Sequence, residues 1–341
     1  MYCFDFPVSH TILLTGAGFT HNFGGFLARS MWAEIHNRFE RRNQGTEHTK
    51  LRNQIKRNFD YEELYQVAVN TNEYAEEEKS DFIDSVLEAY DALDGVIRDF
   101  KIRYITAGPS LDLNLIKNFL SRLAGKSGEK AFFFTLNQDI FVERYFSTLR
   151  PVCPGVKLNY ARFNIGPAKI LEESDYVRIP THQELEEHKR SMKSLGQLYY
   201  VKLHGSYDWR DENNQKKLLI GTNKPGEIRN EPLLSWYFQL FKDVLSLPNP
   251  RLLIIGYGFR DRHINQVIAN SSKQSNLKVY IISPEDPGSF RSNTLKINNA
   301  VNDAVWNAVA GYYPYTFKDL FPYGGGKSQF CQNLVEDFFE N

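Results

Sequence analysis

The feature of the sequence that most constrains the fold is a set of five short apolar runs, each followed at once by small or polar residues. The runs are TILLTG (residues 11–16), KAFFFTL (130–136), LYYVKLHG (198–205), RLLIIGYG (251–258) and KVYIIS (278–283). Short runs that are apolar on both faces are typical of strands in a parallel sheet covered by helices. Because parallel strands end at the same edge of a sheet, the small and polar residues after these runs are predicted to gather there.

Helical patterns separate these runs. Amphipathic helices are predicted within residues 60–100 (two or more), 111–125 (ending at Gly125), 231–247, 261–272 and 327–341. Alternating strands and helices predict an α/β fold with a doubly wound, mostly parallel sheet. We expect a single domain over residues 1–341, with a helical insertion at 30–128 and an irregular lid or small subdomain at 150–197.

Composition excludes several classes of protein. The chain has 341 residues with 41 basic and 41 acidic side chains, whereas nucleic-acid binders usually carry a basic excess, so we expect no direct nucleic-acid binding. Cys3, Cys153 and Cys331 form no Cys-x-x-Cys pair, which predicts reduced structural thiols and no metal centre. No apolar run reaches the roughly 20 residues of a membrane helix, and no secretion signal is recognisable, so we expect a cytoplasmic protein without membrane contact.

The first glycine turn, Gly16-Ala17-Gly18, directly follows the first apolar run. A dinucleotide dehydrogenase has a third glycine where this chain has His21, and an acidic ribose ligand about 20 residues further on that is missing here. Hydride transfer is therefore disfavoured. The backbone N–H groups of this turn and the Thr20 hydroxyl could instead contact a pyrophosphate. Many strand–helix turns contain two glycines without a ligand, so the signal is weak by itself.

Gly256 and Gly258 form a second glycine turn after the fourth run. The adjacent Asp261 could cap the following helix, or it could pair with Arg260 across the turn. The stretch YGGGKSQ (residues 323–329) resembles the end of a phosphate-binding P-loop, but the first glycine of that motif and a preceding strand are both missing. We interpret residues 323–329 as an ordinary loop.

Polar residues follow the other runs at the predicted ligand edge. Thr135 ends the second strand and Asn137 and Asp139 come directly after it, while His204 follows the third strand and Ser283 the fifth. Taken alone, Asp139 could be only a helix N-cap, and His204 could be a structural histidine. Their common position at one edge of the sheet favours a functional interpretation.

In this order the motifs GAGFT, TLNQD, KLHGS and GYGFRD, spread from residue 16 to residue 261, resemble those of the sirtuin family. Sirtuins bind NAD+ and cleave its nicotinamide–ribose bond, and KLHGSYDW and GYGFRD look particularly like bacterial sirtuin-like NAD hydrolases of anti-phage defence. The chain departs from the protein deacylases, which carry two Cys-x-x-Cys pairs and a Pro-Asp-Phe-Arg segment where this chain has residues 21–25, HNFGG. The arginine of that segment has no clear match.

The resemblance implies a Rossmann-like sirtuin core and roles for three residues. Asn137 would position the ribose hydroxyls or the water, Asp139 would accept a hydrogen bond from the nicotinamide carboxamide, and His204 would act as a base near neutral pH. NAD is implied as the substrate, with no metal. The residues expected to contact it are Gly16, Ala17, Gly18, Thr20, Thr135, Gly256, Gly258 and Ser283.

We therefore expect an NAD+ glycohydrolase that yields nicotinamide and ADP-ribose and depletes NAD during anti-phage defence. An unrestrained enzyme would drain its own cell, so we expect control by homo-oligomer formation or by a partner, for which the resemblance suggests a HerA-like ATPase or a phage-sensing protein. Helices within residues 60–120 could be a contact surface or could simply cover the sheet. Two alternatives stay open: a sirtuin-like deacylase or ADP-ribosyltransferase, and a non-catalytic subunit that binds NAD or ADP-ribose.

Overall fold

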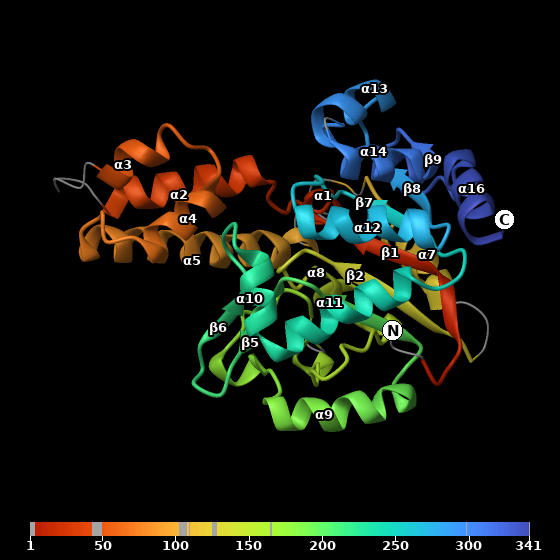
Figure 1. Ribbon diagram of the computed structural model, residues 1–341, viewed down its shortest axis with the longest axis horizontal. Coiled ribbons are helices and arrows are strands. Elements are labelled where there is room, and N and C mark those ends of the chain that lie inside the picture. Colours follow the sequence, from red (N-terminus) through yellow and green to blue (C-terminus); the bar gives the residue numbers. More distant parts are fainter. Residues whose placement is uncertain are drawn as a thin grey trace.

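The computed structural model describes residues 4–42, 50–101, 108, 110–124, 128–163, 166–297 and 299–340. Its centre is a six-stranded sheet with the order β4-β2-β1-β7-β8-β9 (Figure 1). The strands are β1 (Val8–Thr15), β2 (Lys130–Thr135), β4 (Leu198–Lys202), β7 (Arg251–Ile255), β8 (Lys278–Ile282) and β9 (Val309–Tyr313). Every neighbouring pair in this sheet is parallel, which confirms the predicted α/β fold.

All five apolar runs form strands of this sheet, namely β1, β2, β4, β7 and β8. The sixth strand, β9, was not predicted. It lies at an edge of the sheet, it is only partly buried, and Gly311 interrupts its apolar pattern. Because an edge strand is covered less completely than a central one, its sequence carries a weaker apolar signal.

Alternate residues of the strands point to opposite faces, and each face packs against its own apolar cluster. In β1, Leu13 belongs to one cluster, whereas Ile12 and Leu14 belong to the other. The first cluster receives residues from α1 (Ala17–His21), α2 (Ala28–Arg42), α3 (Lys50–Ile55), α4 (Tyr61–Asn70), α5 (Glu76–Arg98), α7 (Leu113–Ser121), α8 (Phe141–Tyr145), α15 (Phe317–Leu320) and α16 (Gln329–Val335). The second receives residues from α9 (His182–Ser191), α10 (Lys224–Asn230), α11 (Pro232–Leu245), α12 (Arg262–Gln274) and α14 (Ala300–Asn307). The sheet is therefore doubly wound, as predicted.

Helices α2 to α5 fall within the predicted insertion and project to one side of the sheet (Figure 1). The buried ion pair between Asp94 of α5 and Arg144 of α8, at 2.7 Å, fastens this group of helices to the sheet layer. Helix α7 lies apart from them, against β1 and β2, through the short turn Arg122–Ala124. Gly125, the predicted end of this helix, lies outside the described residues.

The segment 150–197 is largely irregular, with α9 and the short strand β3 (Val177–Arg178) as its main regular elements. Strand β3 pairs with β5 (Gly205–Arg210), and β5 pairs with β6 (Lys216–Leu218), to form a second, three-stranded sheet. Buried side chains of the segment, including Leu185 and Met192, join the second apolar cluster. Packing of this kind fits the small-subdomain alternative better than a lid.

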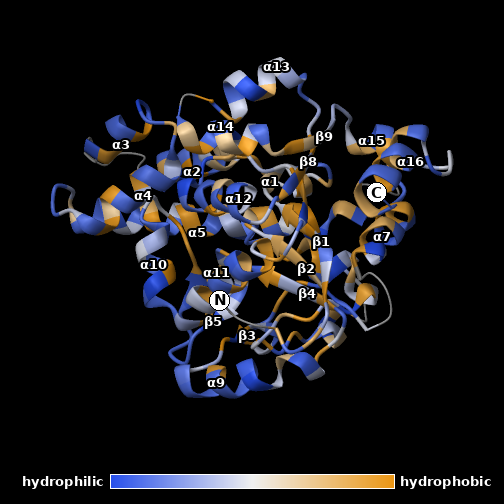
Figure 2. Ribbon diagram, turned by 45° about the vertical axis from the view of Figure 1, so that its right-hand side comes forward, coloured by the Kyte–Doolittle hydropathy of each residue, from blue (hydrophilic) through white to orange (hydrophobic). Residues whose placement is uncertain are grey.

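Hydropathy follows the layers, with apolar strands at the centre and polar surfaces on outer helices such as α9 and α13 (Pro287–Ser289) (Figure 2). Within the described part of the chain, no helix combines the length and apolarity that a bilayer crossing requires. Cys153 and Cys331 are buried, free thiols, and burial raises the pKa of Cys153 to about 12. Cys3 lies outside the described residues. Residues 323–328 form a loop, as predicted.

Candidate functional site

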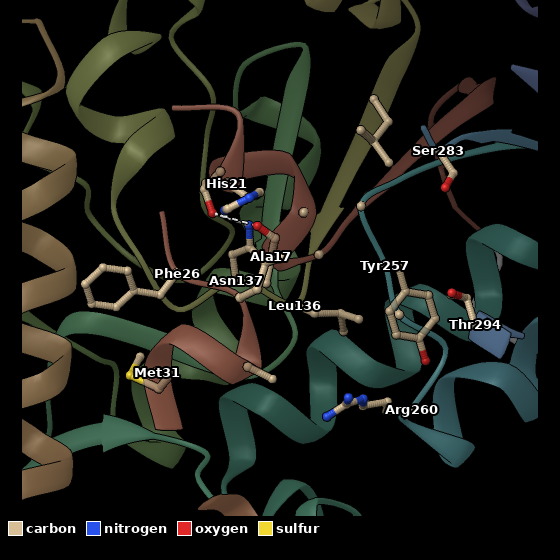
Figure 3. A pocket seen from close by; sticks show the side chains of 18 of the residues that line it. Ala17, His21, Phe26, Met31, Leu136, Asn137, Tyr257, Arg260, Ser283 and Thr294 are labelled. Atoms are coloured by element: carbon tan, nitrogen blue, oxygen red, sulfur yellow. Dashed lines mark hydrogen bonds between the residues drawn. The ribbon is translucent and has the colours of Figure 1, made fainter. Parts of the chain in front are cut away.

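A cavity of about 640 Å³ lies at the carboxyl edge of the main sheet. Its walls come from the turns after β1, β2, β4, β7 and β8 and also from helices α2, α4 and α5 of the insertion. Figure 3 shows the cavity with Ala17, His21 and Asn137 near its middle, Phe26 and Met31 on one side, and Tyr257, Arg260, Ser283 and Thr294 on the other. The cavity is therefore elongated across the strand ends, where doubly wound sheets bind nucleotides.

The three predicted catalytic residues, Asn137, Asp139 and His204, all line this cavity. The predicted cofactor contacts also line it, with one exception: the lining includes Gly16, Ala17, Gly18, Thr20, Gly256, Gly258 and Ser283. Residues that are far apart in the sequence are thus brought together at one edge of the sheet. Of the described residues between 150 and 197, none contributes to the wall.

Thr135, which was also predicted to contact the ligand, is the exception and does not line the cavity. Its side chain is buried at the end of β2, where its hydroxyl accepts hydrogen bonds from the Thr15 hydroxyl (2.8 Å) and the Asn137 backbone N–H (3.0 Å). Asn137 in turn donates from its amide nitrogen to the Thr20 hydroxyl at 3.3 Å. Thr135 therefore positions Asn137 from beneath the cavity.

The two glycine turns pack backbone to backbone. Gly16 N–H donates to the Ile255 carbonyl (3.0 Å), and Gly18 N–H donates to the Gly256 carbonyl (2.9 Å). A Cβ atom on Gly256 would lie 2.2 Å from the backbone nitrogen of Phe19, and its φ of +66° also favours glycine. The N–H groups of Gly16 and Gly18 are consequently engaged within the fold, which corrects the expectation that they donate to a pyrophosphate.

Other donors in the cavity suit an anionic ligand. Ala17 is the first residue of α1, so its N–H has no acceptor within that helix. Arg29 and Arg260 line the cavity, and neither has an ion-pair partner among the residues that the structure describes. Arg29, at the start of α2, brings a guanidinium to the wall, whereas no arginine of residues 21–25 matches that of the sirtuin segment.

Asp139 lines the cavity with only 7% of its surface exposed. One carboxylate oxygen accepts the backbone N–H of Phe141 at 3.0 Å, but the N-cap position of α8 belongs to Ile140, so the expectation that Asp139 caps this helix is not met. Burial raises the pKa of Asp139, and the nearby charge of Lys202 opposes that rise. Lys202 is itself buried, where it donates to the Asp139 carbonyl and pairs with Glu143 at 3.0 Å.

His204 sits beside a buried group of charges that sequence reasoning missed. Lys224, from the start of α10, contacts Glu62 of α4 at 2.9 Å and Asp261 at 3.0 Å. The same Asp261 oxygen lies 4.0 Å from Nε2 of His204. Asp261 therefore pairs with Lys224 and not with Arg260, and as the N-cap of α12 it makes no side-chain capping bond.

Burial and the Lys224 charge lower the pKa of His204 to about 3. The imidazole is therefore neutral at physiological pH and has an unprotonated nitrogen, which a base near neutral pH requires. Burial opposes the charge of Lys224, but Asp261 and Glu62 together raise the pKa of the ammonium group. The cation at this site is thus the lysine, and the imidazole nitrogen remains available as an acceptor.

The opposite end of the cavity is formed by the turn after β8. Ser283 is buried there, and the carboxylate of Glu285 accepts the Thr294 hydroxyl at 2.8 and 2.9 Å. Tyr257 donates to the Asp261 carbonyl (3.1 Å) and to Asn265 (2.8 Å), which ties the second glycine turn to α12. A carboxylate just past a strand end is the group that dinucleotide-binding folds use for ribose hydroxyls.

Two comparisons with known proteins bear on this site. A family model described as a SIR2-like domain matches residues 131–303, half of the chain, and this range includes Asn137, Asp139, His204 and the second glycine turn. No curated protein matches the chain. The first glycine turn lies outside the matched range, yet β1 pairs directly with β2 and β7, so the turn belongs to the same cavity.

Proposed function

The chain belongs to the SIR2-like family, and from this premise we propose that it is an NAD+ glycohydrolase that cleaves the nicotinamide–ribose bond to give nicotinamide and ADP-ribose. Members of this family are NAD-dependent enzymes. The biological setting that we propose is depletion of NAD during anti-phage defence.

One observation carries the proposal: Asn137, Asp139 and His204 line the same elongated cavity as the two glycine turns and the Glu285 carboxylate. A dinucleotide lying across the strand ends would place its adenosine near Ser283 and Glu285, and its pyrophosphate near Ala17, Arg29 or Arg260. Its nicotinamide ribose would then lie beside the three polar side chains. A cavity volume of about 640 Å³ is within the usual range for cofactor sites.

The proposed cleavage does not depend on a general acid. Nicotinamide in NAD+ already carries the positive charge and departs as a neutral molecule, so no general acid is needed, in contrast to ordinary glycoside hydrolysis. Asn137, held by Thr135 and Thr20, offers an amide oxygen and N–H to the ribose hydroxyls or to a water. Asp139 accepts the carboxamide N–H and fixes the orientation in which nicotinamide leaves.

The neutral imidazole of His204 suits the second half of the reaction. Water that attacks an oxocarbenium-like ribose loses a proton readily, so a weak base is sufficient to accept it. As the proton arrives on His204, the carboxylate of Asp261, 4.0 Å from Nε2, stabilises the resulting cation. Lys224 opposes that charge, which favours rapid return of the proton to solvent.

Water is the acceptor that best fits this chain. Protein deacylases direct the ribose intermediate to an acetyl-lysine beside a zinc module of four cysteines, and the whole sequence contains three cysteines with no Cys-x-x-Cys pair. The module beside which deacylases bind a lysine substrate is thus missing from this sequence. Hydrolysis therefore has more support than deacylation.

The test is nicotinamide release from NAD+ supplied alone. We expect the wild type to release nicotinamide and ADP-ribose in equal amounts without an added acceptor. Asn137→Ala should lower kcat by at least about 100-fold, because it removes a preorganised hydrogen-bonding group at the reacting centre. Asn270→Ala removes an exposed amide on α12 and serves as the matched control.

Equal release by wild type and Asn137→Ala would refute the catalytic assignment. Release that begins only after a protein acceptor is added would identify a transferase or deacylase. NAD binding without turnover, under conditions in which both proteins are folded by circular dichroism, would identify a non-catalytic subunit.

A further inference from the structure

The side chains of His204, Asp261 and His263 gather at one corner of the cavity, and their potential ligand atoms all lie within 4.8 Å of one another. His204 is 3% exposed. Nε2 of each histidine is buried and has no hydrogen-bond partner among the residues that the structure describes. A buried polar nitrogen without a partner is rare in folded proteins, and two of them on histidines of one cluster call for an explanation.

We propose that His204, Asp261 and His263 form a binding site for a divalent transition-metal ion, best satisfied by Zn²⁺, and that occupation of this site inhibits the enzyme. Two imidazole nitrogens and one carboxylate oxygen are the ligands that zinc takes in sites with an open fourth position. Nitrogen ligands select zinc, copper, nickel or cobalt over magnesium and calcium.

The geometry requires only small side-chain movements. Zinc–ligand bonds of about 2.0–2.2 Å place ligand atoms about 3.3–3.5 Å apart in a tetrahedron. The Nε2 atom of His204 is already 4.0 Å from the Asp261 oxygen, and the two imidazole rings are 5.7 Å apart at their centres. Each ligand atom therefore needs to move by about 1 Å or less.

The electrostatics permit a dication. Nε2 of each histidine has no hydrogen-bond partner among the described residues, so each imidazole has a nitrogen to offer. Lys224 carries one positive charge, but it sits between the two carboxylates of Glu62 and Asp261. The group as a whole thus has a net negative charge, although competition from Lys224 for Asp261 should limit the affinity.

Inhibition is expected because the metal ion and the proton from water would bind the same atom, Nε2 of His204. A metal bound to His204 Nε2 occupies the lone pair with which His204 would accept a proton. His204 and Asp261 line the cavity whereas His263 does not, so the ion would be reached from the substrate side. The proposal that the ion binds depends only on the three side chains. The proposal that it inhibits depends on the proposed function as well.

The experiment uses the full chain after treatment with a chelator, titrated with Co²⁺ as a spectroscopic probe and with Zn²⁺ as an inhibitor. We expect one Co²⁺ per chain, with the visible absorbance of four-coordinate cobalt, and inhibition of nicotinamide release by Zn²⁺ that EDTA reverses. His263→Gln should keep the basal rate and lose at least about tenfold in metal affinity, since even outer-shell changes cost 10–100-fold. His188→Gln, an exposed histidine on α9, is the matched control.

Co²⁺ absorbance and Zn²⁺ inhibition of His263→Gln equal to those of the wild type would overturn the proposal. Should His263→Gln fail to fold, His204→Gln must abolish the Co²⁺ absorbance, and its persistence would be equally damaging. A chain that binds Co²⁺ through both histidines but releases no nicotinamide would sustain the metal site while the glycohydrolase proposal fails.

Discussion

The two ends of the cavity are built in opposite ways. At the glycine turns, backbone lies against backbone: Cβ positions on Gly16 and Gly18 would each lie 2.7 Å from atoms of Gly256. At the His204 end, side chains from separate elements meet, with Glu62 from the insertion, Lys224 from α10 and Asp261 from the turn after β7. The first end depends on the absence of side chains, and the second depends on their charges.

This difference predicts which residues of the cavity tolerate substitution. A turn held by backbone contacts tolerates no added atom, so its variants should lose the fold and the ligand together. A cluster of charges has several members, so its variants should shift protonation and stability in graded amounts. Three predictions, from the largest expected effect to the smallest, test this contrast.

Gly256→Ala should have the largest effect, because the new Cβ would meet the backbone nitrogen of Phe19 at 2.2 Å and the φ of +66° disfavours alanine. We expect the free energy of unfolding to fall by about 4 kcal/mol or more, as measured by urea denaturation. Gly258→Ala is the matched control: its Cβ would meet nothing within 4 Å, and its loss should stay under about 1 kcal/mol. Equal midpoints for the two variants would show that the turns are not held by close backbone packing.

Lys224→Met should have the next largest effect, since it leaves Glu62 and Asp261 without their shared cation. Breaking a buried ion pair in this way costs about 3 kcal/mol of unfolding free energy. Removing the positive charge should also raise the pKa of His204 from its value of about 3.

The pH profile of nicotinamide release tests this second effect. His204 must be unprotonated to act as a base, so activity falls as the pH drops through its pKa. Wild-type activity should persist on the acid side of pH 5, while the acid limb of Lys224→Met should move to higher pH. Lys216→Met breaks a surface pair with Asp91 at 3.5 Å and should change stability by less than about 1 kcal/mol. An unchanged acid limb in Lys224→Met would contradict the electrostatic account of His204.

Glu285→Gln should have the smallest effect and act on substrate choice. The Glu285 carboxylate at the end of β8 would repel the 2′-phosphate of NADP, so we expect the wild type to prefer NAD. The amide keeps an acceptor for Thr294 and removes the charge, which should improve the relative kcat/KM for NADP about fivefold, the equivalent of about 1 kcal/mol. Asp303→Asn, on the exposed surface of α14, should leave the preference unaltered. If Glu285→Gln and the wild type have the same kcat/KM for NADP relative to NAD, the adenosine ribose does not lie beside Glu285.

The same contrast explains what could be foreseen from the sequence. Apolar runs that end in glycine or polar residues predict both a buried strand and the position where that strand ends. The strands β1, β2, β4, β7 and β8 were therefore predicted correctly. Asn137, Asp139 and His204 line the cavity, as expected for residues that follow the strands of a parallel sheet. Strand β9 was missed because an edge position and Gly311 weaken its pattern.

The charged end was not foreseeable in the same way. Glu62 lies in a predicted amphipathic helix and Lys224 in a polar stretch, and nothing local distinguishes either from a surface charge. The packing of the insertion beside α10 brings them together. Burial and then the charge of Lys224 lower the pKa of His204. Thr135 shows the reverse case: it has the right position at a strand end, but its hydroxyl turns inward to Thr15.

The pairing of the central strand has a consequence for synthesis. Ile12 of β1 pairs with Phe132 of β2 and with Leu252 of β7, so the first strand to leave the ribosome waits for partners translated far later. At about 5–20 residues per second, that interval lasts on the order of tens of seconds. During that interval the nascent polypeptide contains Gly16 and Gly18 but not yet Gly256, so the contact between the two glycine turns cannot form. Incomplete translation products that stop before β7 are therefore incapable of assembling the cavity.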